Sequence, residues 1–419
     1  MTMTEPAAST IDPDRWPDVA KAPRDRIRAG IAKVLVRRTV SRLPLRVVFP
    51  DGSTLGQAEA PVMTLHRPDA FYQRLGASGL VGFGEAYQAG DWDTDDLAGL
   101  LAVFAQHVTT LVPKQLQWLR HLHGPRHPRA EENTVDGARR NIHRHYDLSN
   151  DLFALFLDES MAYSSALFDV DESGRPAGEL TAAQHRKIDR LLDVTGVGPD
   201  RDVLEIGTGW GELAIRAAQR GARVNTVTIS TEQRDLAQRR VAEAGVADRV
   251  RVELRDYRDI VGPARGYDAV LSVEMIEAVG ERYWPTYFTA IDRLLATDGR
   301  AGIQAITMAH DRLLATRRTY TWMHKYIFPG GIIPSVRAIE DVCRRHTTLR
   351  LQDLHAFGLH YARTLRLWRE RFRHRASEVA ALGFDETFTR TWNLYLAYCE
   401  AGFATGYLNV HHVVLGRSQ

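Results

Sequence analysis

Residues 202–212, Asp-Val-Leu-Glu-Ile-Gly-Thr-Gly-Trp-Gly-Glu, decide the fold of this chain. The apolar run from Val203 to Ile206 predicts a buried strand, and Leu213-Ala-Ile215 predicts the start of a helix. Between them lie Gly207, Gly209 and Gly211. A strand, a tight glycine turn and a helix N-terminus present bare backbone N–H groups to a ligand, as nucleotide-type sites require. The stretch therefore predicts a Rossmann-like α/β domain with a ligand site at the glycine loop.

The glycine spacing narrows the class of ligand. It is G-x-G-x-G, not the G-x-G-x-x-G of dinucleotide-binding proteins, and Glu205 lies inside the strand before the turn. This combination resembles motif I of class I methyltransferases, which use S-adenosylmethionine. The alternative for this stretch taken alone is an ordinary turn between a strand and a helix.

Three more strands follow at the spacing of βαβ units, over residues 223–230, 250–254 and 267–273. Polar residues follow or end each of them: Thr228, Ser230 and Gln233; Asp256, Tyr257 and Arg258; Glu274 and Glu277. The second strand ends in hydroxyl and amide groups where a dinucleotide site would place an acid. Because ligands bind at the carboxyl ends of strands in open α/β sheets, these clusters predict one shared site.

Composition describes an ordinary folded chain. Its 419 residues carry a net charge of +2 and are 44% hydrophobic, which suggests two or three domains. No run approaches the roughly 20 apolar residues of a membrane span, and the N-terminus lacks the apolar core of a signal peptide. Cys343 and Cys399 have no metal-ligand spacing. We therefore expect a cytoplasmic protein without a metal site.

Charge is concentrated between Lys21 and Arg46, where nine basic residues accompany one acid, Asp25. They are interleaved with Ile27, Ile31, Val34, Leu35 and Val40, which form an apolar stripe at helical spacing. Two interpretations remain open: a surface helix that buries its stripe within its own domain, or a basic amphipathic helix that lies on anionic lipid. A nucleic-acid partner is disfavoured because no aromatic stacking platform accompanies the charge.

Domain boundaries follow from a turn-rich segment, Gly124-Pro-Arg-His-Pro-Arg129. We predict an N-terminal α+β domain over residues 1–120, with strands near 45–49 and 62–65 and a role in lipid binding or oligomerisation. Residues 121–140 form the linker, whose histidines lack the spacing of a metal site. Residues 141–419 form the α/β methyltransferase domain, with a mostly parallel seven-stranded sheet.

The segment from His143 to Phe168 closely resembles the opening of cyclopropane fatty acid synthases. Further segments resemble the same family in the same order, namely 205–212, 228–233, 256–259, 325–330 and 360–365, together with Glu277. The resemblance spans about residues 140–419 and extends more weakly to 82–87 and 90–92. The resemblance implies the class I methyltransferase fold, with a seven-stranded sheet.

The resemblance implies methyl transfer from S-adenosylmethionine to a cis double bond in a phospholipid acyl chain. Attack by the alkene leaves a carbocation, and a base must then remove a proton. In the family this base is a bicarbonate ion, held by a cysteine, a glutamate, a histidine, a tyrosine and the backbone of an isoleucine. The matching positions here are Ser165, Glu277, Gln304, Tyr361 and Ile306. Ser165 and Gln304 depart from the pattern, and Gln304 cannot be protonated.

Family correspondence also gives a cofactor site and an acyl-chain tunnel. The cofactor positions are Tyr163, Ser164, Glu205, Gly207, Thr208, Gly209, Gly211, Thr228, Ser230, Gln233, Asp256, Tyr257 and Arg258. Tunnel candidates, which would equally suit a plain core, are Met161, Phe168, Tyr320, Trp322, Tyr326, Ile327 and Phe328. The expected setting is the inner face of the membrane, with peripheral attachment; a homodimer is left open.

The product is expected to be a methylene or methyl branch, because the two departures should loosen the bicarbonate and delay proton removal. A methylene product would need a reductase partner to become a methyl branch, and prompt proton removal would instead give a cyclopropane ring. Two other classes stay open: a class I methyltransferase for another substrate, and an inactive relative that binds lipid or cofactor.

Overall fold

The computed structural model describes residues 11–107 and 149–417. The chain forms two compact units, and the linker expected at 121–140 lies outside the described residues. The first unit comprises residues 1–126, 319–327 and 372–401. The second unit comprises residues 127–318, 328–371 and 402–419.

The first unit begins with a small α+β arrangement. Its sheet has the order β2-β1-β3-β4, and β1 and β3 match the two strands expected near 45–49 and 62–65. The strands are β1 Arg46–Val48, β2 Thr54–Gly56, β3 Val62–Leu65 and β4 Trp92–Asp93. The helices are α1 Pro17–Ala20, α2 Arg26–Val40, α3 Pro68–Ser78, α4 Leu80–Gln88 and α5 Leu97–His107. Helix α2 packs closely on α3, where a Cβ at Gly76 would lie 2.6 Å from the carbonyl of Arg28.

Two segments that the sequence analysis placed in the methyltransferase domain, 319–327 and 372–401, belong to the first unit. They contain α15 Trp322–Tyr326, α18 Ala376–Ala381 and most of α19 Glu386–Ala404. Buried Glu85 accepts hydrogen bonds from Lys325 Nζ at 2.5 Å and from Tyr326 Oη at 2.9 Å. Trp322 is also buried and donates to Gln88 at 2.9 Å. These long-range polar contacts leave no local signal in the sequence, which explains the difference.

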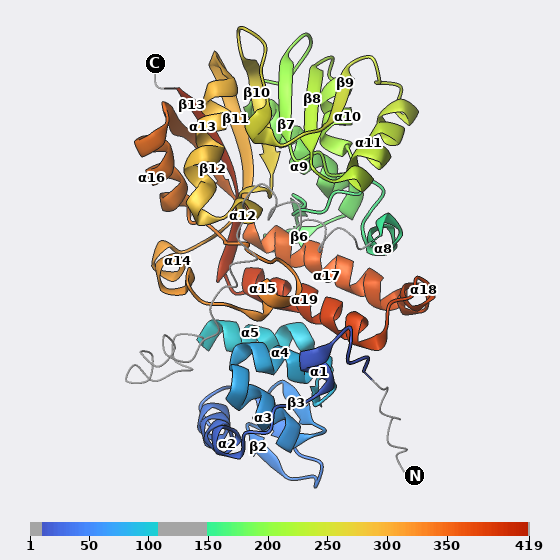
Figure 1. Ribbon diagram of the computed structural model, residues 1–419, viewed down its shortest axis with the longest axis vertical. Helices are drawn as coiled ribbons and strands as arrows, with labels where there is room; N and C mark the ends of the chain where they lie inside the picture. The colour runs from blue at the N-terminus through green and yellow to red at the C-terminus, as the bar shows by residue number, and fades with distance from the viewer. Residues whose placement is uncertain (1–10, 108–148, 418–419) are drawn as a thin grey trace. The chain divides into compact units, whose positions relative to one another are not determined.

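The second unit is built on a seven-stranded sheet of order β12-β13-β11-β10-β7-β8-β9 (Figure 1). Six of the seven strands run in the same direction, and β13 runs antiparallel to them. The strands are β7 Asp202–Ile206, β8 Arg223–Thr228, β9 Val250–Leu254, β10 Tyr267–Val273, β11 Leu295–Met308, β12 Leu349–Ala356 and β13 Leu408–Arg417. The expected Rossmann-like, mostly parallel sheet is confirmed.

Helices cover both faces of this sheet. The helices of the second unit are α8 Asn150–Phe156, α9 Leu180–Val194, α10 Glu212–Gln219, α11 Thr231–Glu243, α12 Ile276–Val279, α13 Trp284–Leu294, α14 His310–Thr316, α16 Val336–His346 and most of α17 Gly358–His374. One core joins α9, α10 and α11 to the strands, and includes Leu191, Leu213 and Val203. The other joins α13 and α16 to the opposite face, and includes Phe288, Ile339 and Leu204. A short hairpin, β5 Asp169–Val170 and β6 Pro176–Ala177, completes the unit.

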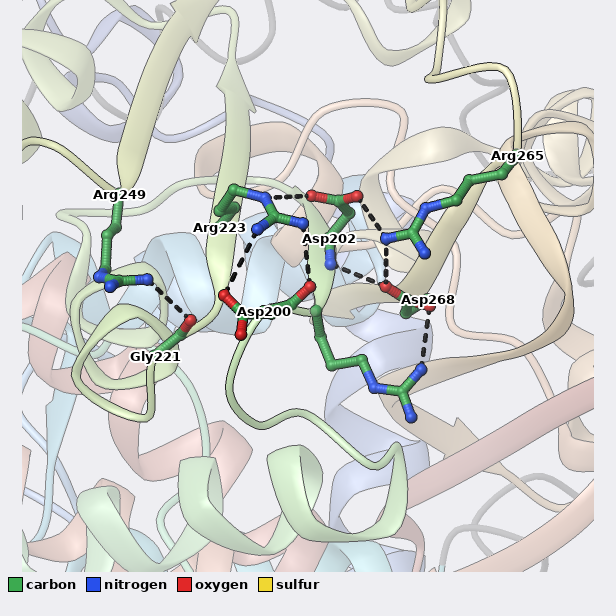
Figure 2. A network of polar contacts seen from close by, with 8 residues as sticks. Asp200, Asp202, Gly221, Arg223, Arg249, Arg265 and Asp268 are labelled. Atoms are coloured by element: carbon green, nitrogen blue, oxygen red, sulfur yellow. Dashed lines mark hydrogen bonds and ion pairs between the residues drawn. The ribbon is translucent and has the colours of Figure 1, made fainter.

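Arginines and aspartates link the amino ends of the parallel strands (Figure 2). Arg223 contacts Asp200 and Asp202, and Arg265 contacts Asp202 and Asp268. Asp268 also accepts the backbone N–H of Asp202 at 2.8 Å. Exposed ion pairs contribute about 1 kcal/mol or less each, so this network mainly aligns the strand starts. It lies at the end of the sheet opposite the carboxyl ends that carry the ligand site.

Across the described ranges 11–107 and 149–417, no helix is both long and apolar enough to span a bilayer.

Candidate active site

A pocket opens at the carboxyl ends of β7, β8, β9 and β10 in the second unit. Eleven of the thirteen cofactor positions expected from the sequence line it: Tyr163, Ser164, Glu205, Gly207, Thr208, Gly209, Thr228, Gln233, Asp256, Tyr257 and Arg258. The remaining two, Gly211 and Ser230, lie outside the lining and begin helices. Gly211 is the N-cap of α10 with φ 94°, and the Ser230 hydroxyl accepts the N–H of Gln233 at the start of α11.

The glycine loop keeps the floor of the pocket open. Gly207 and Gly209 have φ of 95° and 52°, a region that L-residues with a side chain rarely adopt. A Cβ at Gly207 would meet the Met275 side chain at 2.6 Å, whereas a Cβ at Gly209 would meet nothing within 4 Å. Gly209 lines the pocket, so any side chain there would take up ligand space.

Polar groups after β8 and β9 supply hydrogen bonds without a carboxylate at the end of β8. The Thr228 hydroxyl donates to Gln233 Oε1 at 2.8 Å. Asp256 holds Arg258 through two side-chain contacts of 2.8 and 2.6 Å. Burial raises the pKa of Tyr257 to about 12, so its phenol stays neutral, and its ring packs edge-on against Tyr287. This wall suits the hydroxyl-rich and aromatic parts of a nucleoside.

Two buried ionisable groups, Glu205 and Lys187, line the pocket and interact electrostatically. Glu205 is 3% exposed, and burial raises its pKa to about 8, while Thr226 donates to its Oε2 at 2.6 Å. Lys187 is 2% exposed, and burial lowers its pKa to about 8. Its Nζ donates to Ser164 Oγ at 2.7 Å, which leaves the Ser164 hydroxyl proton for another acceptor. Lys187 was not anticipated, because a lysine within a helical stretch carries no signal of burial.

Glu274 lines the same pocket and is the centre of a cluster of polar groups, here called the Glu274 cluster, that contains Ser165, Gln304 and Tyr361. Its Oε1 accepts from the backbone N–H of Ser165 at 2.9 Å and from Gln304 Nε2 at 2.8 Å. Its Oε2 accepts from the Tyr361 hydroxyl at 2.6 Å. Burial raises the pKa of Glu274, and the three donors oppose that rise. Glu274 also has φ 50°, a strained conformation for a residue with a side chain, of the kind that clusters at functional sites.

The five positions matched to the bicarbonate site are brought together, although in an unexpected pattern. Ser165, Gln304 and Tyr361 all donate to Glu274, which the resemblance did not include. The backbone N–H of Ile306 donates to Glu277 Oε1. Glu277 Oε2 is buried with no hydrogen-bond partner among the described residues. Burial and the nearby Glu274 raise the pKa of Glu277 to about 8, so the protonated form predominates at neutral pH.

This pattern does not fit a bound bicarbonate ion. The donors that would hold the ion are already engaged within the protein. Gln304, Tyr361 and the backbone N–H of Ser165 donate to Glu274, the backbone N–H of Ile306 donates to Glu277, and the Ser165 hydroxyl donates to the carbonyl of Ala166. The Glu274 carboxylate provides the negative charge and the acceptor oxygens that an ion would bring. The sequence did carry a signal for it: Glu274 directly follows β10, at the end of the sheet where ligands bind.

The pocket does fit S-adenosylmethionine. Open space beside Gly209, the polar groups after β8 and β9, and the ring of Tyr257 suit its methionyl, ribose and adenine parts. Among the expected tunnel residues, Met161 lines this pocket, while Trp322, Tyr326 and Ile327 belong to the first unit.

Comparisons with known proteins agree with the geometry. A family model described as mycolic acid cyclopropane synthetase matches residues 134–413. The chain is 55% identical to tuberculostearic acid methyltransferase UfaA1 of Mycobacterium tuberculosis, over 99% of this chain and 98% of that protein. It is 33% identical to the cyclopropane-fatty-acyl-phospholipid synthase of Escherichia coli, over 86% and 89%. A crystal structure of mycolic acid cyclopropane synthase CmaA1 complexed with SAH and CTAB matches with a TM-score of 0.60, 28% identity and coverage of 66% and 97%.

Proposed function

The chain belongs to the mycolic acid cyclopropane synthetase family and is an S-adenosylmethionine-dependent methyltransferase, and we propose that it methylates the cis double bond of unsaturated phospholipid acyl chains to give a methylene-branched product. The observation that carries the product class is the 55% identity, over nearly the full length of both chains, to a tuberculostearic acid methyltransferase. Formation of a cyclopropane ring is the second candidate, supported by the more distant synthase from Escherichia coli.

The cofactor supplies an activated methyl group, and the pocket residues hold it. We assign the adenosine part to Thr228, Gln233, Asp256, Tyr257 and Arg258, and the methionyl part to the loop around Gly207 and Gly209. Tyr163 and Ser164 complete the wall. Because Lys187 holds the Ser164 oxygen, the Ser164 hydroxyl can donate to the carboxylate of the methionyl part. The buried charge of Lys187 favours the same anion.

We assign the role of proton acceptor to Glu274, supported by its place in the pocket lining. With the cofactor bound, attack of the alkene carbon on the methyl group would form one C–C bond and break the S–CH3 bond. S-adenosylhomocysteine would leave with the electron pair of that bond, and a carbocation would remain on the acyl chain. A carboxylate stabilises that cation electrostatically and then takes a proton from the transferred methyl group. Tyr361, Gln304 and Ser165 position the carboxylate, and no step needs a bicarbonate ion.

The same donors favour a branch over a ring. Three hydrogen bonds to Glu274 stabilise its charged form and oppose the rise in its pKa that burial causes, so they make it a weaker base than the same buried carboxylate without them. Slower proton removal allows a hydride to shift from the methylated carbon to its neighbour before the methyl group loses a proton. The methyl group then loses its proton, and the electrons of the broken methyl C–H bond form the double bond of a C=CH2 group. A reductase that delivers hydride and a proton would convert it to a methyl branch, so we propose such a partner.

Product analysis tests this function. Pure protein is incubated with S-adenosylmethionine labelled in the methyl group and vesicles of an oleoyl phospholipid, and the fatty acids are separated by gas chromatography with mass detection. We expect label in a methylene-branched acid. A cyclopropane acid as the main product would favour the second candidate, and cofactor binding without transfer would indicate an inactive relative.

Helix α2 supports a peripheral place on the inner face of the membrane. Its apolar stripe is exposed: Ile27 is 79%, Ile31 57% and Val34 66% accessible. Leu35 is also exposed, at 41%, and among the described residues only the last position of the stripe, Val40, is buried. Basic residues flank the stripe, namely Arg24, Arg26, Arg28, Lys33, Arg37, Arg38 and Arg42, all of them exposed. An apolar stripe with basic flanks is the pattern that docks on anionic lipid.

Vesicle binding is expected to depend on salt. At about 1 kcal/mol for each basic residue near an anionic surface, four or five engaged side chains suffice for reversible docking. Raising the ionic strength from about 0.1 M to about 1 M shortens the screening length from about 10 Å to about 3 Å, so co-sedimentation with anionic vesicles should fall sharply.

Two variants locate the docking surface. Lys33→Glu together with Ile31→Ser should weaken vesicle binding, whereas Arg337→Glu, an exposed charge change on α16, should not. Binding that ignores both salt and the α2 variant would contradict the assignment.

A further inference from the structure

A fully buried histidine, His412, lies directly behind the Glu274 cluster. It is on β13, paired with Gln304 of β11 in the antiparallel register, so the two side chains share one face of the sheet. His412 Nε2 lies 3.0 Å from Gln304 Oε1. On its other side, His412 Nδ1 lies 2.9 Å from Arg190 Nη1 of α9. Arg190 in turn forms an ion pair with Asp353 at 3.1 Å.

The donor inventory fixes the direction of every bond in this chain. A guanidinium has only donors, so His412 Nδ1 must accept from Arg190. A neutral imidazole then carries its proton on Nε2 and donates it to Gln304 Oε1. With its oxygen engaged, the Gln304 amide turns its NH2 group toward Glu274, where Nε2 lies 2.8 Å from Oε1.

The surroundings keep the ring neutral. Burial, assisted by the charges of Arg190 and Lys187, holds the pKa of His412 well below its usual range. Phe357 packs edge-on against the His412 ring, with the ring centroids 4.8 Å apart. His355 of β12 is paired with His412 across the two strands. The one donor proton of His412 is therefore committed to Gln304.

We propose that Arg190 and His412 are positioning residues that fix the orientation of the Gln304 amide and so keep a hydrogen-bond donor on the Glu274 carboxylate. This inference rests on the proposed role of Glu274 as proton acceptor. If the amide turned over, its oxygen would face Glu274 Oε1 at hydrogen-bond distance, and two acceptors would repel. Glu274 would then gain a proton from solvent more readily, so at a given pH a smaller fraction of the protein would hold the ionised carboxylate that takes a proton from the transferred methyl group.

Kinetics of three variants test this series of hydrogen bonds. His412→Leu removes the donor, so kcat should fall about tenfold to a hundredfold, the worth of one hydrogen bond to a charged group, with little change in KM for S-adenosylmethionine. His412→Gln offers an amide N–H near the position of Nε2 and should recover much of the loss. His411→Leu is the matched control, because His411 contacts Thr307 and takes no part in the hydrogen bonds between Arg190 and Glu274. Its kcat should stay close to wild type.

A spectroscopic measurement is independent of turnover. Long-range nitrogen–proton correlation spectra of histidine-labelled protein should show His412 as the neutral Nε2–H tautomer at neutral pH. Arg190→Met should give a mixture of tautomers, because nothing then forces Nδ1 to accept. An Nδ1–H tautomer or an imidazolium in the wild type, or equal losses of kcat in His411→Leu and His412→Leu, would overturn the proposal. The correct tautomer in a protein that transfers no methyl group would instead count against the proposed function alone.

Discussion

Replacing Glu274 by glutamine is expected to lower the rate of methyl transfer at least about 100-fold, the lower end of what general-base catalysis contributes. Glutamine has nearly the same shape as glutamate, but it cannot take a proton from the transferred methyl group and brings no charge to face the carbocation. Single-turnover rates with methyl-labelled S-adenosylmethionine and oleoyl phospholipid vesicles measure the loss. Calorimetry should show that cofactor affinity is largely retained, because Glu274 is assigned no contact with the cofactor.

The pH profile gives the same assignment a second test. Glu274 must be ionised to accept a proton, and burial raises its pKa above the ordinary value for glutamate. Activity should therefore rise with pH as Glu274 loses its proton, and fall on the acidic side as the proton returns. A wild-type profile that shows no acidic limb down to the ordinary range of glutamate would contradict this role.

Glu277→Gln is the matched control, since Glu277 is a second buried carboxyl three residues away. Its pKa is raised to about 8, so at pH 7 its protonated form predominates and glutamine is a close substitute. The amide oxygen of the variant can still accept from the N–H of Ile306. We expect Glu277→Gln to lose clearly less activity than Glu274→Gln. Equal losses would mean that the two carboxyl groups act as one unit, and the separate roles would have to be abandoned.

The sheet and the cofactor pocket could be predicted because their signals are local. Val203 to Ile206 is an apolar run that ends in glycines, and each later strand ends in polar residues, so a short window of sequence shows both the element and its ligand edge. Ser230 illustrates the limit of that reading. It lies in the expected segment, but its hydroxyl caps α11 and does not line the pocket.

The cluster of polar side chains around Glu274 could be predicted only in part, because it depends on tertiary geometry. Ser165, Gln304 and Tyr361 were expected together from the family pattern, yet the group they hold is Glu274. His412 was missed because its role comes from strand register: only the pairing of β11 with β13 places it opposite Gln304. The segments 319–327 and 372–401 of the first unit could not be anticipated for the same reason, since Lys325 contacts Glu85 across 240 residues of chain.

Gly209→Val is expected to abolish binding of the cofactor while the fold persists. Gly209 has φ 52° and lines the pocket, and its missing side chain leaves space that no described atom fills within 4 Å. A valine there places two methyl groups where the methionyl part of the ligand is assigned. The same change also strains the backbone, by about 1–3 kcal/mol for a residue held at positive φ. Binding loss and strain must therefore be separated.

Gly196 offers the means to separate them. It also has positive φ, at 71°, and a Cβ there would meet nothing within 4 Å, but it follows α9 outside the pocket lining. Gly196→Val should lower the melting temperature about as much as Gly209→Val does, because both carry the same kind of backbone strain. Calorimetry with S-adenosylhomocysteine should then detect binding to Gly196→Val at wild-type affinity and none to Gly209→Val. Unchanged affinity in Gly209→Val would show that the glycine loop does not hold the cofactor, and loss of affinity in both variants would show that strain alone is responsible.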